Sequence, residues 1–213
     1  MIEEADEAAL RAAMQGLASP RLRLGCRRIR AGDAGLLLPE ETATIAARQL
    51  SARQASGAAR ALARDLMEEE GLEAGAIIRS AAGSPVWPAG VTGSLAHDDE
   101  MAVAVIARRS DILSVGIDVE PAAPLPDDVA ALVQTAADVV TGTARNLATR
   151  LLFSAKEAVY KACYPLHETI LDYPDIRIDL TRGEAITITG FRAGLRFCLS
   201  PRIVVLAVAF HPA

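Results

Sequence analysis

The sequence has no excess of basic residues. Its 213 residues include 22 Lys and Arg against 27 Asp and Glu, which gives a formal net charge of -5. A dedicated nucleic-acid-binding protein usually presents a strongly basic face, so we expect no nucleic-acid partner. A local basic pocket for a small phosphorylated ligand remains compatible with this charge.

Cysteines are few and lack the spacing of a metal or redox motif. Cys26, Cys163 and Cys198 are an odd number, form no CxxC pair, and each lies among apolar or strand-like residues. We interpret them as reduced structural thiols of a cytosolic protein.

Signals for secretion or membrane insertion are also missing. The first residues, "MIEEADEAAL", are acidic and show no basic region followed by an apolar run. No uncharged apolar stretch approaches the roughly 20 residues needed to cross a bilayer. We therefore expect a cytoplasmic location and no membrane partner.

The apolar content and its periodicity predict a folded α+β protein. About half of the residues (51%) are apolar, which suits one compact domain or two intimately packed half-domains. Helices are predicted over 3–16, 51–70, 127–137 and 143–164, and strands in "RLRLGCRRIR" and over 91–96, 101–108 and 112–120. From residue 174 the pattern turns to strands: "DIRIDL", "EAITITG", "LRFCLS" and "RIVVLAVAF". This order favours α+β over a regular βαβ repeat.

The strand "VGIDVEP" (115–121) contains two carboxylates. Side chains alternate faces along a strand, so Asp118 and Glu120 share one face with Gly116, which has no side chain to crowd them. Two like charges about 7 Å apart resist desolvation unless a cation lies between them. Mg²⁺ typically takes one or two carboxylates together with waters and phosphate oxygens. The alternative is a strand whose acidic face is simply solvated.

The segment "FSAKEAVYKA" (153–162) supplies a third carboxylate and two lysines. On a helix, Glu157 and Lys161 are one turn apart and can face the same point. Two simpler readings compete: Ser154 and Glu157 have the spacing of a capping box, and Glu157 with Lys161 is a favourable pair on any exposed helix. Combined with the acidic strand, the three acids could hold Mg²⁺ on a diphosphate while Lys156 neutralises phosphate.

Three blocks stand in order along the chain: "VWPAGVTGSLAH" (86–97), "VGIDVE" (115–120) and "FSAKEAVYKACYPL" (153–166), with a weaker echo in "ILDY" (170–173). Together they resemble the 4'-phosphopantetheinyl transferases of the larger type that serves siderophore, peptide and polyketide synthetases, notably the enterobactin-synthetase branch. The resemblance implies two similar α+β half-domains related by a pseudo-twofold, with coenzyme A in the cleft between them. We expect these half-domains at 1–110 and 111–213, the second carrying most metal and catalytic residues.

The implied reaction transfers the 4'-phosphopantetheine group of coenzyme A to a serine of an apo acyl, peptidyl or aryl carrier protein and releases adenosine 3',5'-bisphosphate. The resemblance implies Asp118, Glu120 and Glu157 as ligands of the Mg²⁺ cofactor, and Glu157 and Lys161 as catalytic residues. A free lysine titrates near 10.4, so Lys161 needs a depressed pKa to act as the base. Otherwise Glu157 or a metal-bound water takes the proton, and Lys161 contacts phosphate instead. The protein is expected to be a monomer.

Contacts to coenzyme A are implied for Lys156 and His97 at the cleft, and for Arg53 and Arg60 in the helix before it. The chain departs from the family pattern near His97. Relatives often carry Ser or Thr where Ala96 stands, and a basic residue in the loop that here reads "SAAGS", which leaves Arg79 as the nearest candidate. The acids of "DDE", directly after His97, lie close to the expected phosphate site.

Two other functions fit the same residues. One is a metal-dependent phosphohydrolase acting on a nucleotide or diphosphate, although no second dense carboxylate or histidine cluster is found. The other is a non-catalytic homologue that binds coenzyme A or a carrier protein.

Overall fold

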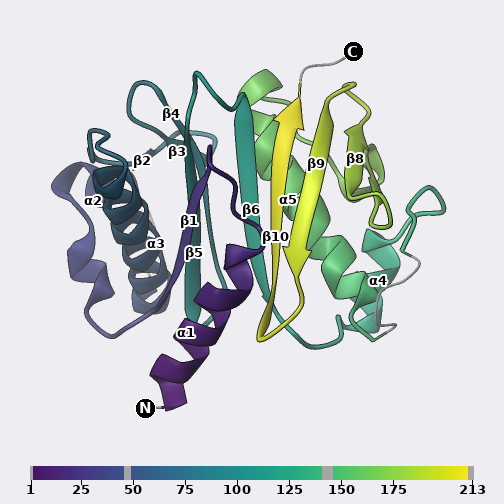
Figure 1. Cartoon of the computed structure of the whole chain (residues 1–213), viewed down its shortest axis with the longest axis horizontal. Coiled ribbons are helices and arrows are strands. Elements are labelled where there is room, and N and C mark those ends of the chain that lie inside the picture. The colour runs from purple at the N-terminus through teal and green to yellow at the C-terminus, as the bar shows by residue number, and fades with distance from the viewer. Residues whose placement is uncertain (1, 46–48, 141–145, 211–213) are drawn as a thin grey trace.

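The structure is a computed structural model that describes residues 2–45, 49–140 and 146–210. Two antiparallel sheets form its centre (Figure 1). The first has the order β1-β5-β4, from β1 (Arg23–Arg28), β5 (Met101–Arg108) and β4 (Val91–His97). The second has the order β6-β10-β9-β8-β7, from β6 (Ser114–Pro121), β10 (Arg202–Phe210), β9 (Arg192–Cys198), β8 (Glu184–Thr187) and β7 (Ile176–Asp179). The mixed helix and sheet architecture confirms the predicted combination of α and β elements.

One long helix packs on each sheet. Helix α3 (Leu50–Glu69) contacts β1, β4 and β5, and α5 (Ala148–His167) contacts β6 and β10. Helix α5 lies behind the larger sheet in Figure 1. The shorter elements are α2 (Pro39–Thr44), α4 (Asp127–Val133), the 3-10 helices η1 (Asp33–Leu36) and η2 (Tyr173–Asp175), and the paired strands β2 (Ile78–Arg79) and β3 (Pro85–Val86).

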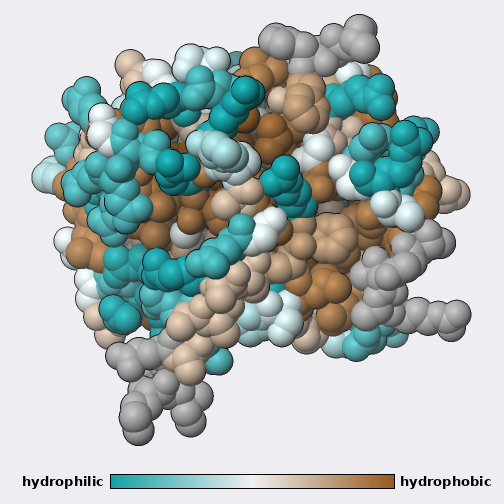
Figure 2. All heavy atoms as spheres, viewed as in Figure 1, coloured by the Kyte–Doolittle hydropathy of each residue, from teal (hydrophilic) through white to brown (hydrophobic). Residues whose placement is uncertain are grey.

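The N-terminal helix α1 (Ile2–Gln15) contacts strands of both sheets, β1 and β9. Its residues Leu10 and Met14 are buried in one apolar cluster with side chains of β5, β6 and β10. The face of the molecule on which α1 lies is mixed, with hydrophobic residues showing between hydrophilic groups (Figure 2). Burial of apolar side chains from both sheets in one cluster couples the sheets to each other.

Most predicted elements agree with the structure to within a few residues, and the strand 101–108 agrees fully. The predicted helix 127–137 is shorter and ends at Val133. Of the predicted helix 143–164, residues 143–145 lie outside the described residues, and its end extends through Pro165 to His167. A proline is tolerated there because its missing N–H costs one hydrogen bond in the last turn only. Among the described helices, none is both long and apolar enough to span a bilayer.

Candidate active site

The acidic face of β6 is turned towards α5. A Cβ placed on Gly116 would lie 1.9 Å from the carbonyl oxygen of Ala158, so strand and helix touch backbone to backbone at this point. Two residues further along β6, the side chain of Asp118 is buried, with 8% of it exposed. The reading of this strand as having a solvated acidic face is therefore wrong for Asp118.

Lys161 of α5 is the cation that meets this buried acid. Its Nζ donates to Oδ1 of Asp118 at 2.6 Å and to the carbonyl oxygen of Ile117 at 3.4 Å. The ion pair thus joins two elements, whereas a pair with Glu157 within the helix was the simpler prediction. The capping-box reading of Ser154 is also wrong, because α5 begins at Ala148 and Ser154 is buried inside it.

The second oxygen of Asp118 lacks a partner. Its Oδ2 is buried and has no hydrogen bond to the described residues. Burial raises the pKa of Glu120 and of Glu157, and the charge of Asp118 raises both further. Negative charge is therefore unfavourable at both glutamates, and carboxylate oxygens fit a hard cation such as Mg²⁺. Among the described residues, no three His, Cys, Asp or Glu side chains are already arranged as a metal site.

Glu120 and Glu157 each have a neighbour that the sequence analysis did not identify. Arg150 donates to Oε2 of Glu120 at 2.6 Å and also to the carbonyl oxygens of Ala123 and Pro124. The hydroxyl of Tyr173 lies 3.5 Å from Oε1 of Glu157. Seven-residue spacing places Arg150 and Glu157 on one side of α5, and Tyr173 belongs to the "ILDY" echo, so both positions carried a weak signal.

Lys156 does not occupy a position suited to phosphate contact. Its side chain is fully buried, with 0% exposed, and its Nζ donates to the carbonyl oxygens of Val133 and Tyr173 and to Oδ2 of Asp138 at 2.8 Å. All three ammonium donors are used inside the protein. The expectation of a phosphate contact at Lys156 is corrected to a buried ion pair.

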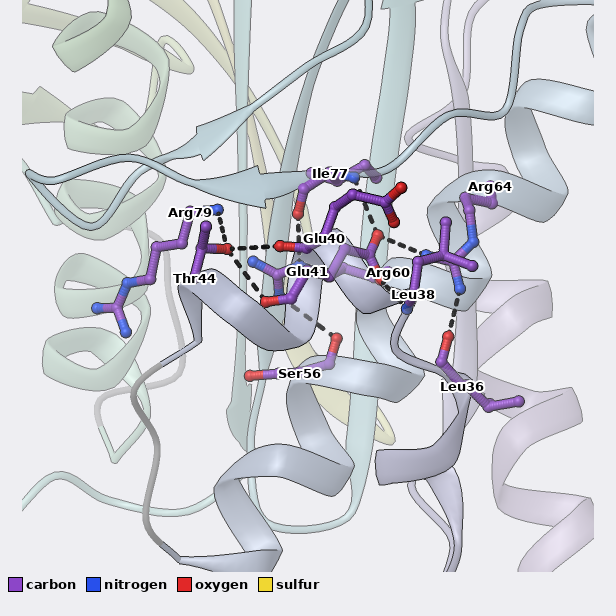
Figure 3. A network of polar contacts seen from close by, with 10 residues as sticks. All are labelled: Leu36, Leu38, Glu40, Glu41, Thr44, Ser56, Arg60, Arg64, Ile77 and Arg79. Atoms are coloured by element: carbon purple, nitrogen blue, oxygen red, sulfur yellow. Dashed lines mark hydrogen bonds and ion pairs between the residues drawn. The ribbon is translucent and has the colours of Figure 1, made fainter.

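Arg60 is likewise buried in a network within the N-terminal half (Figure 3). Its Nε donates to the carbonyl oxygen of Ile77 at 2.8 Å, and Arg64 one turn along donates to the buried Glu41. Arg53 is partly exposed near the start of α3, and His97 is exposed at the end of β4, with Nδ1 3.3 Å from the carbonyl oxygen of Asp98. The structure thus brings together Asp118, Glu120, Glu157 and Lys161, while Arg60 and Lys156 serve internal contacts.

A cavity of about 300 Å³ is lined by Glu157 and by residues from distant parts of the chain. Glu157, Lys161 and Tyr160 of α5 line one side, and Ser94 of β4 with Arg79 of β2 line the other. The network around Arg60 fixes the backbone of Arg79, whose N–H donates to Thr44, while the Arg79 side chain points away from the network (Figure 3). An arginine, a lysine and a carboxylate therefore line one space between the β2–β4 segment and α5.

Two family models match successive parts of the chain. Residues 40–107 match the model of the 4'-phosphopantetheinyl transferase N-terminal domain, and residues 114–208 match that of the 4'-phosphopantetheinyl transferase superfamily. The chain belongs to the 4'-phosphopantetheinyl transferase superfamily. The cavity of this superfamily member is lined from both matched regions, by residues between 79 and 95 in the first and by residues of α5 in the second.

Two relatives carry the family name, and a third is named as a component of enterobactin synthase. The chain is 38% identical over 149 residues to 4'-phosphopantetheinyl transferase Svp of Streptomyces mobaraensis, a match that covers 67% of this chain and 61% of the relative. It is 38% identical over 145 residues to 4'-phosphopantetheinyl transferase PptT of Mycobacterium tuberculosis, covering 66% of this chain and 64% of the relative. Enterobactin synthase component D of Escherichia coli K12 is 38% identical over 84 residues, 37% of this chain and 39% of the relative. The matches thus span less than two thirds of each relative's length.

Proposed function

We propose that this chain transfers the 4'-phosphopantetheine group of coenzyme A to a serine of an apo carrier protein. The observation that carries the proposal is the cavity between the β2–β4 segment and α5, which is lined by Arg79, Lys161 and Glu157, with Lys161 bound to the buried Asp118. Family membership supports the reaction class, and the cations suit a ligand that carries several phosphates.

Mg²⁺ would be held by Asp118, Glu120 and Glu157. The unpartnered Oδ2 of Asp118 supports this role, as does the raised pKa of the two glutamates, whose burial disfavours their charged forms. Arg150 engages Oε2 of Glu120, which leaves Oε1 of that residue for a cation. When bound, Mg²⁺ would neutralise charge on the diphosphate of coenzyme A.

Glu157 is the stronger candidate for the proton acceptor. The Nζ of Lys161 already donates to Oδ1 of Asp118 at 2.6 Å, so this group is engaged as a hydrogen-bond donor. Burial raises the pKa of Glu157, which makes its carboxylate a better base for a serine hydroxyl. Lys161 would then orient Asp118 and offer positive charge to a phosphate. His97 and Arg53, both accessible, remain proposed contacts of coenzyme A.

The expected half-domains at 1–110 and 111–213, and their pseudo-twofold relation, also stay proposals. Their support is that the strands of the smaller sheet all precede residue 109, while those of the larger sheet begin at Ser114. Each sheet packs against one long helix, α3 or α5. A monomer and a cytoplasmic location are proposed with the same enzyme.

The test is transfer by the purified chain to a panel of apo carrier proteins, read as a mass gain on the carrier. Transfer should require coenzyme A and Mg²⁺ together, and Glu157→Gln should abolish it, while Glu73→Gln at an exposed position should not. Failure on several unrelated carriers would overturn the proposal. Phosphate release from coenzyme A or a nucleotide without any carrier would favour a phosphohydrolase instead.

A further inference from the structure

An ion pair between the two sheets involves the acids that follow His97. Arg202 at the start of β10 is paired with Asp98 through Nη1, and its Nη2 lies 2.6 Å from Oε2 of Glu100. The side chain of Arg202 is 17% exposed and that of Asp98 only 7%. Because both side chains are largely buried, solvent screens the ion pair between Arg202 and Asp98 less than it screens an ordinary surface pair.

Asp98 also builds the turn between β4 and β5. Its Oδ1 accepts the N–H groups of Glu100 and Met101, each at 2.8 Å, while its own N–H donates to the carbonyl oxygen of Met101 at 3.0 Å. One carboxylate therefore shapes the turn with one oxygen and binds Arg202 with the other. Glu100 has a second cation, Arg28, at 3.7 Å, so Asp98 is the acid whose pairing depends on Arg202.

Arg202, in β10, lies beside the end of β6 that carries the candidate metal ligand Glu120. In the ladder between β10 and β6, Arg202 is opposite Pro121 and Ile203 is opposite Glu120. The turn that Arg202 binds is continuous with His97, the last residue of β4. The guanidinium thus links the strand end bearing Glu120 to the strand end bearing His97, which belong to different sheets.

We propose that Arg202 is a positioning residue that holds the turn after His97 against the acidic end of β6 and neutralises Asp98 beside the cleft. The inference rests on the proposed transferase function and adds to it a residue outside the cavity lining. It also accounts for "DDE" next to a polyanion site: the charge of Asp98 is balanced by Arg202, so it opposes the phosphates of coenzyme A less than a free carboxylate would.

The test compares Arg202→Gln and Asp98→Asn, singly and together, with Arg182→Gln as a matched control. Among the described residues, Arg182 forms an ion pair with the half-exposed Glu184, and the side chain of Arg182 is 70% exposed. Asp98→Asn keeps an oxygen for the turn while removing the charge, so it tests the pair even where Arg202→Gln folds poorly. Arg202→Lys, which keeps the charge, should restore part of the lost affinity.

Two readouts separate positioning from a general structural role. Hydrogen exchange at the amides of Glu100 and Met101 should become faster in Arg202→Gln. The KM for coenzyme A should rise about 10-fold with kcat within about twofold, and the double variant should be no worse than Arg202→Gln, because the pair between Asp98 and Arg202 is lost in all three. Arg182→Gln should change neither quantity.

An unchanged KM in Arg202→Gln would overturn the positioning role, whatever the exchange rates show. Equal effects of Arg202→Gln and Arg182→Gln would overturn it as well. A wild-type chain that transfers nothing would overturn the proposed function and the positioning role with it, while hydrogen exchange would still establish whether Arg202 holds the turn.

Discussion

Gly116 of β6 lies directly against the carbonyl group of Ala158 in α5. An ideal Cβ at Gly116 would be 1.9 Å from the Ala158 oxygen and 2.7 Å from the Ala162 nitrogen, and neither backbone atom can move without moving the helix. This contact sets the separation between the strand that carries Asp118 and the helix that carries Glu157 and Lys161.

Replacing Gly116 with alanine should therefore displace α5 from β6. We expect Gly116→Ala to lower the free energy of unfolding by about 3 kcal/mol, the upper part of the range for overpacked cores. Urea unfolding followed by circular dichroism would measure this loss. Gly35→Ala is the control, because a Cβ at Gly35 would meet nothing within 4 Å. Equal stability of the two variants would contradict the contact.

Removing Lys156 should destabilise the protein without acting on coenzyme A directly. Lys156→Met leaves Asp138 buried without its cation, a change that typically costs about 3–5 kcal/mol. Adding Asp138→Asn should recover part of this loss, because the amide carries no charge and still accepts hydrogen bonds. Chemical unfolding measures both, with the exposed Arg182→Met as a control expected to cost less than about 1 kcal/mol.

The same variants distinguish a structural lysine from a phosphate contact. Among Lys156→Met molecules that remain folded, the KM for coenzyme A should equal that of the wild type. A selective rise in KM with unchanged stability would restore the original expectation for Lys156.

Arg79 should contribute to coenzyme A affinity. Its side chain lines the cavity opposite Glu157 and Lys161, and its Nε donates only to the carbonyl oxygen of Gly83 among the described residues. Loss of one charge-assisted contact to phosphate in Arg79→Gln should raise the KM for coenzyme A about 10-fold, equivalent to about 1.4 kcal/mol. Arg21→Gln, at an exposed position outside the cavity lining, should leave KM unchanged, and a similar rise in both variants would argue against a specific contact.

The buried thiols should be slow to alkylate. Cys26 and Cys163 are free, and burial raises the pKa of each thiol to about 11 from 9.0. The thiolate is the reactive form, so at pH 8 their reaction with iodoacetamide should be about 100-fold slower than after unfolding and should accelerate as pH rises towards 11. Mass spectrometry of quenched samples gives the rates, and rapid modification of either residue in the folded protein would contradict this burial.

The sequence was most informative where a pattern repeats locally. Alternation placed Asp118 and Glu120 on one face of a strand, and helical spacing placed Glu157 beside Lys161, and both agree with the structure. Neither pattern could decide whether the acidic face was solvated, because the burial of Asp118 depends on the packing of α5 against β6. The two paired residues, Asp118 and Lys161, are more than 40 residues apart in the sequence.

Predictions failed where the depth of a side chain depends on distant segments. Lys156 lies in a segment with alternating basic and acidic residues, a pattern typical of an exposed helix face. Its ammonium group nevertheless donates to Val133, Asp138 and Tyr173 inside the protein. The pairing of Asp98 with Arg202 spans 104 residues and has no local signature. Ion pairs between remote segments require the fold before they can be recognised, because each partner alone is an ordinary surface charge.

The construction of the cavity affects how activity can change during evolution. Arg79 and Ser94 line it together with Glu157 and Lys161. One wall belongs to the segment from β2 to β4 and the other to α5, which packs on the larger sheet, so small shifts of α5 relative to β4 alter the width of the binding site while every residue that contacts the ligand stays the same. Laboratory selection for new acceptor proteins or altered pantetheine donors should therefore enrich substitutions at the seam between β4 and β6 as well as in the lining itself.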